Sequence, residues 1–112
     1  MYEYKGKVIN IVDGDTLDVI IHLGFEITKK LRIRLYGIDT PETYRPSCNE
    51  EYKEGLKAKQ FVKDMVLDKD VIIKTYKDKK GKYGRYLADI IVNDNSLVDS
   101  LKENGFEKRE SY

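Results

Sequence analysis

The sequence predicts a mainly β domain with two helices (α+β), and three features of the chain indicate that fold class. Its 112 residues are enough for one domain with one modest core. The first half is rich in β-branched residues that alternate with polar ones, which is typical of strands. One stretch of the second half has the apolar period of an amphipathic helix. We therefore expect a single domain over residues 1–112.

Five segments have the pattern of short strands. They are residues 5–12, 16–23, 31–37, 70–76 and 86–92. In the third segment, "LRIRLYG", the period of two places Leu31, Ile33 and Leu35 on the core face. Arg32 and Arg34 then share the opposite face, where we expect Arg32 to be solvated.

Two segments have the pattern of helices. In residues 54–67 an apolar stripe recurs at helical spacing: Ala58, Phe61, Val62, Met65 and Val66. The stretch before it, "TYRPSCNEEYKEG", is polar and predicts a surface loop. A shorter helix over 97–104 can begin at Asn95 or Ser96 as N-cap and stop at Gly105.

The resulting order, β-β-β-α-β-β-α, narrows the architecture to two candidates. It fits a five-stranded Greek-key barrel of the oligonucleotide/oligosaccharide-binding (OB) type. An open α+β sandwich fits the order almost as well, and the order of elements alone does not separate them.

Composition excludes several classes of protein. The net charge is +1, from 21 basic and 20 acidic residues, so any attraction to nucleic acid must come from local clusters. The single cysteine, Cys48, excludes an internal disulfide. No stretch has the length of a membrane span, and residues 1–20 lack a secretory signal pattern. We expect no membrane association, and either a cytoplasmic protein or the mature part of a secreted or larger one.

Three motifs contain residues suited to chemistry, and each stands at the end of a predicted strand: "VDGDT" (12–16), "RLYGIDTPE" (34–42) and "KYGR" (82–85). Asp13 and Gly14 predict an ordinary hairpin turn. Asp15 has the parity of the core-facing positions of the second strand, so its carboxylate would sit at the mouth of the barrel. A carboxylate there needs a partner or a metal ion.

The acidic residues of the first two motifs are suited to a hard divalent cation. Asp15 and Asp39 could supply carboxylate oxygens and Thr40 a backbone carbonyl, the donors that calcium prefers. No cluster of cysteine and histidine points to zinc.

Other residues of these motifs are suited to a phosphate and an attacking water. Arg34 and Arg85 have planar forked donors that match phosphate oxygens, and Glu42 is placed to align or deprotonate a water. A basic run could attract a phosphate backbone, although each lysine alone fits a solvated loop equally well: Lys77, Lys79, Lys80 and Lys82.

These motifs resemble those of the staphylococcal nuclease-like (thermonuclease) family. The resemblance runs through "DGDT", "RIRLYGIDTPE", "KYGRYLA" and "SLVDSLKENGF", over roughly residues 4–107. It implies an OB-fold barrel and calcium-dependent cleavage of DNA and RNA, preferentially single-stranded, with 3′-phosphate ends and a monomeric protein.

The resemblance also implies roles for single residues. It makes Asp15, Asp39 and the Thr40 carbonyl the calcium ligands. It makes Arg34 and Arg85 the arginines that grip the phosphate and Glu42 the general base. It places Lys82 and Tyr83 near the phosphate of the bound nucleotide.

The chain departs from the family pattern at three points. The hairpin between Asp15 and Arg34 is about five residues longer than in the type member. Gly81 stands where an aspartate is common before Lys-Tyr-Gly-Arg. Tyr112 is the only candidate for the tyrosine pair that flanks the base in the type member, and its register differs.

Two alternatives to a nuclease remain open. A binding module on the same fold would hold nucleic acid or protein without cleaving it. Such a module is expected to have lost catalytic residues, and none of Asp15, Arg34, Asp39, Glu42 or Arg85 is missing. A structural or interaction domain would make the three motifs unrelated turns.

Overall fold

The computed structural model describes residues 2–43, 46–80 and 86–109, with the backbone alone for 77–80. Within these residues, six strands and two helices follow one another: β1 (Glu3–Asp13), β2 (Thr16–His22), β3 (Thr28–Leu35), α1 (Asn49–Val66), β4 (Asp70–Lys80), β5 (Tyr86–Val92), β6 (Asn95–Ser96) and α2 (Leu97–Glu103). Neither helix is both long and apolar enough to cross a membrane.

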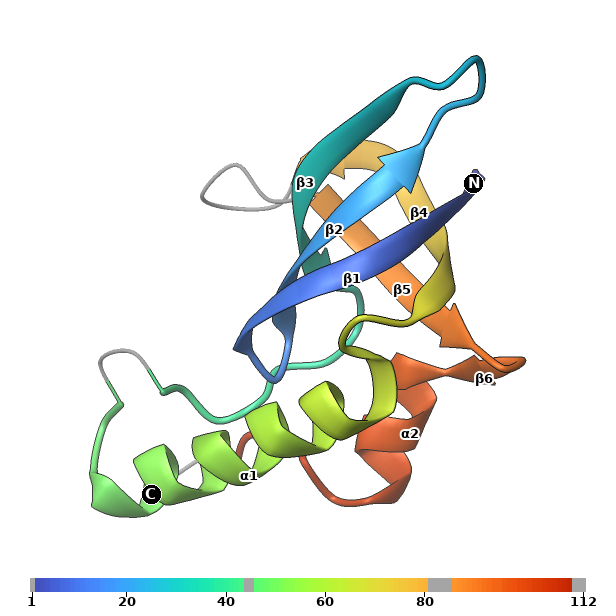
Figure 1. Ribbon diagram of the computed structural model, residues 1–112. Coiled ribbons are helices and arrows are strands. Elements are labelled where there is room, and N and C mark those ends of the chain that lie inside the picture. The colour runs from blue at the N-terminus through green and yellow to red at the C-terminus, as the bar shows by residue number, and fades with distance from the viewer. Residues whose placement is uncertain (1, 44–45, 81–85, 110–112) are drawn as a thin grey trace.

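The first five strands form a closed barrel (Figure 1). Their order in the sheet is β3-β2-β1-β4-β5, with antiparallel neighbours throughout. A parallel pairing of β3 with β5, from Ile33 with Tyr86 to Leu35 with Ala88, closes the sheet on itself. The predicted OB-type barrel is therefore confirmed, and the open sandwich is wrong.

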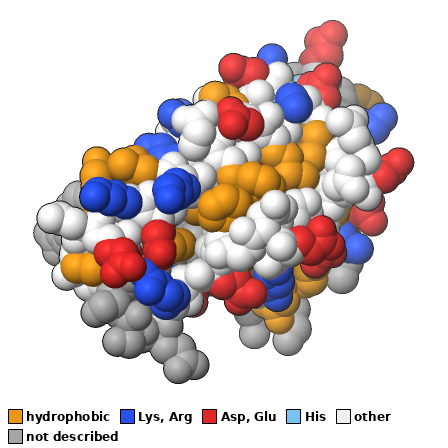
Figure 2. All heavy atoms as spheres, turned by 90° about the horizontal axis from the view of Figure 1, so that it is seen from below, with side chains coloured by type: hydrophobic (Ala, Val, Ile, Leu, Met, Phe, Trp, Pro, Cys, Tyr) orange, Lys and Arg blue, Asp and Glu red, His pale blue; other side chains and the backbone are white. Residues whose placement is uncertain are grey.

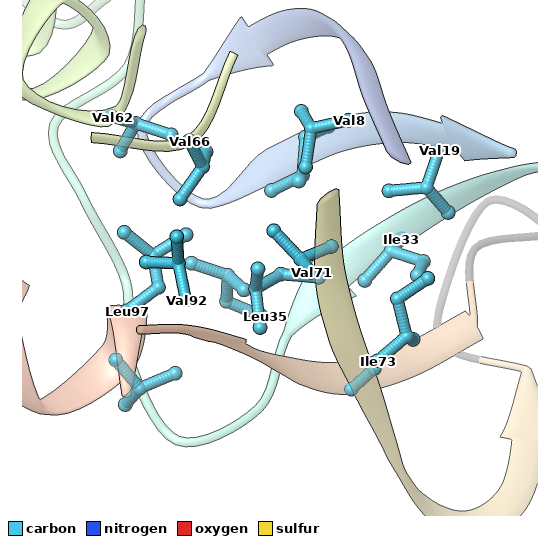
Figure 3. Close-up of a cluster of buried hydrophobic side chains, with 14 of the residues drawn as sticks. Val8, Val19, Ile33, Leu35, Val62, Val66, Val71, Ile73, Val92 and Leu97 are labelled. Atoms are coloured by element: carbon cyan, nitrogen blue, oxygen red, sulfur yellow. The ribbon is translucent and has the colours of Figure 1, made fainter. Parts of the chain in front are cut away.

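Alternation along the strands fills the barrel, as the sequence pattern predicts. Leu17, Val19, Ile33 and Leu35 are each at most 1% exposed. Val62 and Val66 of α1 join the same cluster and cover one end of the barrel, and Leu97 of α2 packs beside them (Figure 3). In Figure 1 both helices lie under that end of the barrel. Burial of this apolar surface is the main force that holds the helices to the sheet.

The apolar stripe predicted for the first helix is confirmed, but the predicted first residue of that helix is wrong. Ser96 is the N-cap of α2, and its side chain accepts a hydrogen bond from the Asp99 N–H at 3.2 Å. Helix α1 begins at Asn49 instead of 54, so much of the predicted surface loop is helical. Glu50 and Glu51 lie in its first turn, where negative charge favours a helix.

Two strands also differ from the prediction. β4 continues to Lys80, which pairs with Tyr86, so the backbone of residues 77–80 is strand and not loop. β6 was not predicted. It follows a two-residue turn in which Asn93 and Asp94 have φ of 49° and 65°, the left-handed pair that favours tight hairpins.

Candidate active site at the rim of the barrel

The candidate site lies where the β1–β2 turn meets the chain that leaves β3. The turn consists of Gly14 and Asp15, between the paired residues Asp13 and Thr16. After Leu35 the chain passes through Gly37, whose φ of 86° is a left-handed conformation open to glycine, and descends toward α1. These segments enclose an open cleft of about 610 Å³.

Four of the predicted site residues line this cleft together: Asp15, Arg34, Asp39 and Glu42. They come from separate segments, up to 27 positions apart in sequence. Lys82, Tyr83 and Arg85 lie outside the described residues. Lys79 and Lys80 are in β4, and only their backbone is described.

Arg34 is the centre of the charged contacts. Its Nη1 donates to the carbonyls of Leu35 and Ile38 at 2.6 and 2.5 Å, which fixes the guanidinium against the turn after β3. Its Nη2 forms an ion pair with Asp39 and lies 3.5 Å from Oδ2 of Asp15. One nitrogen of the fork therefore faces both carboxylates.

Arg32, the other arginine of β3, has a different environment. It pairs with the buried Asp18 at 2.9 Å on the outside of the sheet, so it is less free than predicted. The hydrogen bond from Arg32 lowers the pKa of Asp18. Because neither residue lines the cleft, this pair is a structural contact of β2 with β3.

Asp15 has hydrogen-bond partners, as the sequence predicts for a carboxylate at the mouth of the barrel. It is 6% exposed, and its side chain accepts hydrogen bonds from the Thr40 N–H at 3.0 Å and the Thr16 hydroxyl at 3.1 Å. Its own carbonyl accepts from the Leu35 N–H at 2.8 Å. The Asp39 side chain, by contrast, is 76% exposed.

Glu42 is a half-buried carboxylate at the edge of the same cleft. Burial raises its pKa, and the negative charges of Asp13 and Asp15 raise it further, against a smaller opposite effect of Lys108. A carboxylate with a raised pKa is a stronger base, which suits proton transfer near neutral pH.

Glu51 positions the segment that carries Glu42, and sequence reasoning missed it. This carboxylate is 1% exposed. It accepts hydrogen bonds from the N–H groups of Ser47 at 2.6 Å and Glu42 at 3.2 Å, and from Nζ of Lys108 at 3.1 Å. The stretch "NEEYKEG" is polar enough to suggest an exposed loop, and only tertiary contacts bury one of its glutamates.

The predicted hairpin turn at Asp13 and Gly14 is confirmed, because Asp13 pairs with Thr16 across it, but Asp13 also makes contacts that the sequence did not predict. It is buried, and its carboxylate accepts from both the N–H and the hydroxyl of Thr43. Asp13 thus ties the end of β1 to the segment after Glu42, which the prediction of a simple hairpin turn did not anticipate.

Two glycines let this segment pack closely. A Cβ on Gly55 of α1 would lie 2.8 Å from the Pro41 carbonyl and 2.9 Å from that of Glu42. A Cβ on Gly14 would lie 2.8 Å from the Thr40 hydroxyl. Glycine inside a helix costs about 1 kcal/mol relative to alanine, so Gly55 was a sequence signal that the segment approaches α1 here.

The donor chemistry of the cleft fits a hard divalent cation. The carboxylates of Asp15 and Asp39 both line the cleft and face the same nitrogen of Arg34. Thr40, the third predicted ligand, is buried beside them and is not part of the lining of the cleft. No three carboxylate, histidine or cysteine side chains among the described residues are grouped to hold a metal by themselves. Backbone, hydroxyl or water oxygens would have to complete the coordination.

Fold and site together define a class: a small OB-type β-barrel with a polar cleft at one rim. The match to a family model is more specific. The model described as "Staphylococcal nuclease homologue" matches residues 32–110. The chain belongs to the staphylococcal nuclease family.

Similar proteins include both named and uncharacterized relatives. The chain is 40% identical over 118 residues to the uncharacterized protein MJ1439 of Methanocaldococcus jannaschii, covering 89% of this chain and 55% of that protein. It is 34% identical over 110 residues to endonuclease YhcR of Bacillus subtilis, covering 93% and 9%. It is 30% identical over 110 residues to the thermonuclease of Staphylococcus hyicus, covering 98% and 62%. The chain thus spans less than two thirds of the length of each.

Proposed function

We propose that this protein is a nuclease that hydrolyses phosphodiester bonds of DNA and RNA, preferentially single-stranded, with calcium as cofactor and as a monomer. One observation carries the proposal: Asp15, Arg34, Asp39 and Glu42 line a single cleft although they come from different segments. Family membership and the nuclease names of two relatives support it.

Asp15, Asp39 and the Thr40 carbonyl would hold the calcium ion. When bound, it would polarise a phosphoryl oxygen and offset the charge that develops there. The carboxylates of Asp15 and Asp39, which Nη2 of Arg34 faces, would carry the negative charge that holds the ion.

Arg34 would orient the phosphate and stabilise the charge of the transition state. Its Nη1 is anchored to two backbone carbonyls, so the guanidinium needs little reorganisation when substrate arrives. Such preorganised donors are worth about 10²–10³-fold in rate. Arg85 is proposed as the second fork, with Lys79, Lys80, Lys82 and Tyr83 on the substrate side.

Glu42 would act as general base. Its carboxylate would accept a proton from a water that attacks phosphorus in line, and the bond to the 5′ oxygen would break. The 5′ oxygen leaves with the electron pair of that bond and takes up a proton from solvent, which gives a 3′-phosphate and a 5′-hydroxyl. The raised pKa of Glu42, caused first by burial, favours this role.

Incubation of the protein with single-stranded DNA and RNA tests the proposal, with calcium and then with EGTA, for wild type and Glu42→Gln. We expect cleavage with calcium only, and a loss of about 10²–10⁴-fold in Glu42→Gln. Oligonucleotide binding without cleavage would instead indicate a binding module. Cleavage that persists in EGTA would contradict the metal assignment.

A further inference from the structure

Tyr36 and Tyr76 form a stacked aromatic pair beside the cleft. Their ring centroids are 4.3 Å apart, and the ring planes differ by 16°. Tyr76 belongs to β4, whereas Tyr36 directly follows β3. Tyr36 is 45% exposed although Tyr76 stacks on its ring, so part of this residue remains accessible from solvent.

Tyr36 lies on the same side of the chain as Arg34. The Tyr36 N–H donates to the Ala88 carbonyl at 3.0 Å, so the chain remains extended and paired one residue beyond β3. Leu35 between them points into the core and is fully buried. Side chains two positions apart then emerge on one face, with Cα atoms about 7 Å apart. Both Tyr36 and Arg34 line the cleft.

We propose that Tyr36, backed by Tyr76, is a stacking platform for one nucleobase of a single-stranded substrate; this inference rests on the proposed function. An aromatic ring beside a phosphate-binding fork is suited to a ligand that joins an anionic group to a flat ring. A nucleotide is such a ligand. Stacking on an aromatic ring tolerates any base, because every base has a π face.

The pair also explains how the platform is held ready. A lone exposed tyrosine would have to be ordered when the base binds, which costs conformational entropy. The stacking contact with Tyr76 holds the ring of Tyr36 in place before binding. A bound base would extend the stack to three layers.

The test measures binding without cleavage. Anisotropy of a labelled oligothymidylate is titrated with protein in EGTA, and the titration is repeated with an oligomer of abasic residues, which retains the phosphates. We expect Tyr36→Ala to weaken binding of oligothymidylate roughly 5- to 100-fold and to leave binding of the abasic oligomer unchanged. Tyr36→Phe retains a ring and should bind as wild type does, whereas Tyr76→Ala should show a smaller loss.

Tyr2→Ala is the matched control, because Tyr2 is also exposed and does not line the cleft. It should bind both oligomers like wild type. The inference is overturned if Tyr36→Ala binds oligothymidylate normally, or if it loses affinity equally for both oligomers. If the wild type cleaves and either of these results is found, the nuclease proposal stands and only the stacking inference fails. If Tyr36→Ala loses affinity only for oligothymidylate and the wild type does not cleave, the stacking inference stands and the nuclease proposal fails.

Discussion

Glu51→Gln removes one negative charge from the interior with little change of shape. The wild-type carboxylate is 1% exposed and receives three donors, from Ser47, Glu42 and Lys108. Glutamine has one oxygen in place of two, and its amide group would face N–H donors. At least one buried donor then loses its acceptor. We therefore expect a large loss of stability from this isosteric change.

The size of the loss can be worked out in two ways. Losing charge-assisted hydrogen bonds in the interior costs about 2–4 kcal/mol. Burial alone would raise the pKa of Glu51, but the hydrogen bonds from Ser47, Lys108 and Glu42 outweigh it and lower the pKa from 4.5 to about 2. A difference of that size corresponds to about 3 kcal/mol of stability at neutral pH. The midpoint of thermal unfolding should fall by ~10 °C or more.

The sign of the pH dependence follows from the lowered pKa. The contribution of Glu51 is complete above its unfolded value of 4.5 and is lost as the pH falls toward the folded value of about 2. The free energy of unfolding of wild type and Glu51→Gln should therefore differ by about 3 kcal/mol at pH 7 and by less than half of that at pH 3.

Urea unfolding followed by circular dichroism between pH 3 and 7 measures this difference. Glu50→Gln is the control, because Glu50 is the exposed neighbour and pairs only at the surface with Arg109. It should cost about 0.5 kcal/mol or less. Equal stability of Glu51→Gln and wild type at pH 7, or a difference that does not shrink with acid, would refute the reasoning.

Three further perturbations test the cleft. Arg34→Lys loses the fork and the anchor to two carbonyls, so kcat should fall about 10²–10³-fold; an unchanged kcat contradicts its role. Cleavage by wild type should decline as the pH falls through the raised pKa of Glu42, above 4.5, and a rate profile with no acid limb would remove Glu42 as base. Gly55→Ala pushes a Cβ against the carbonyls of Pro41 and Glu42; we expect a cost of about 1–3 kcal/mol in urea unfolding together with reduced kcat, and wild-type values for both would contradict the packing.

The core face of the strands could be predicted, because the alternation in the sequence agrees with the observed burial. The order of elements fitted an open sandwich as well, and only the family resemblance implied the closed barrel. Leu17, Val19, Ile33 and Leu35 have core parity and are buried. The same parity predicts that Asp15 needs a partner at the barrel mouth. The alternation along single strands therefore predicts both the core residues and the residues at the strand ends that lie at the rim of the barrel.

Contacts between distant segments could not be predicted in this way. The burial of Glu51 depends on Ser47, Glu42 and Lys108, the last of which lies far along the chain. The stacking of Tyr36 on Tyr76 depends on where β4 passes the end of β3. A periodic pattern predicts the face of the strand or helix on which a residue lies. It does not predict which residue from a distant segment contacts it.

Charge distribution supports the view that substrate binding is local. Figure 2 shows basic and acidic side chains intermixed on the face seen from below, where neither sign dominates. With a net charge of +1, the protein has no large overall charge to attract a phosphate backbone, so any attraction would come from local groups. Affinity would then come from the proposed phosphate contacts of the arginines and of Lys79, Lys80 and Lys82, and from the ring of Tyr36.

The segment that carries Asp39, Thr40 and Glu42 owes its position to contacts on three sides. The Thr40 N–H is bonded to Asp15 in the β1–β2 turn, and the Glu42 N–H is bonded to Glu51 at the start of α1. On the third side, the Asp39 carbonyl accepts from the Lys108 N–H at 2.7 Å. Since catalysis needs the base and the phosphate donors in fixed relation, loosening any one of these contacts should lower kcat even where no cleft residue is altered. Glu51→Gln should therefore reduce cleavage as well as stability, at temperatures where the variant is still folded.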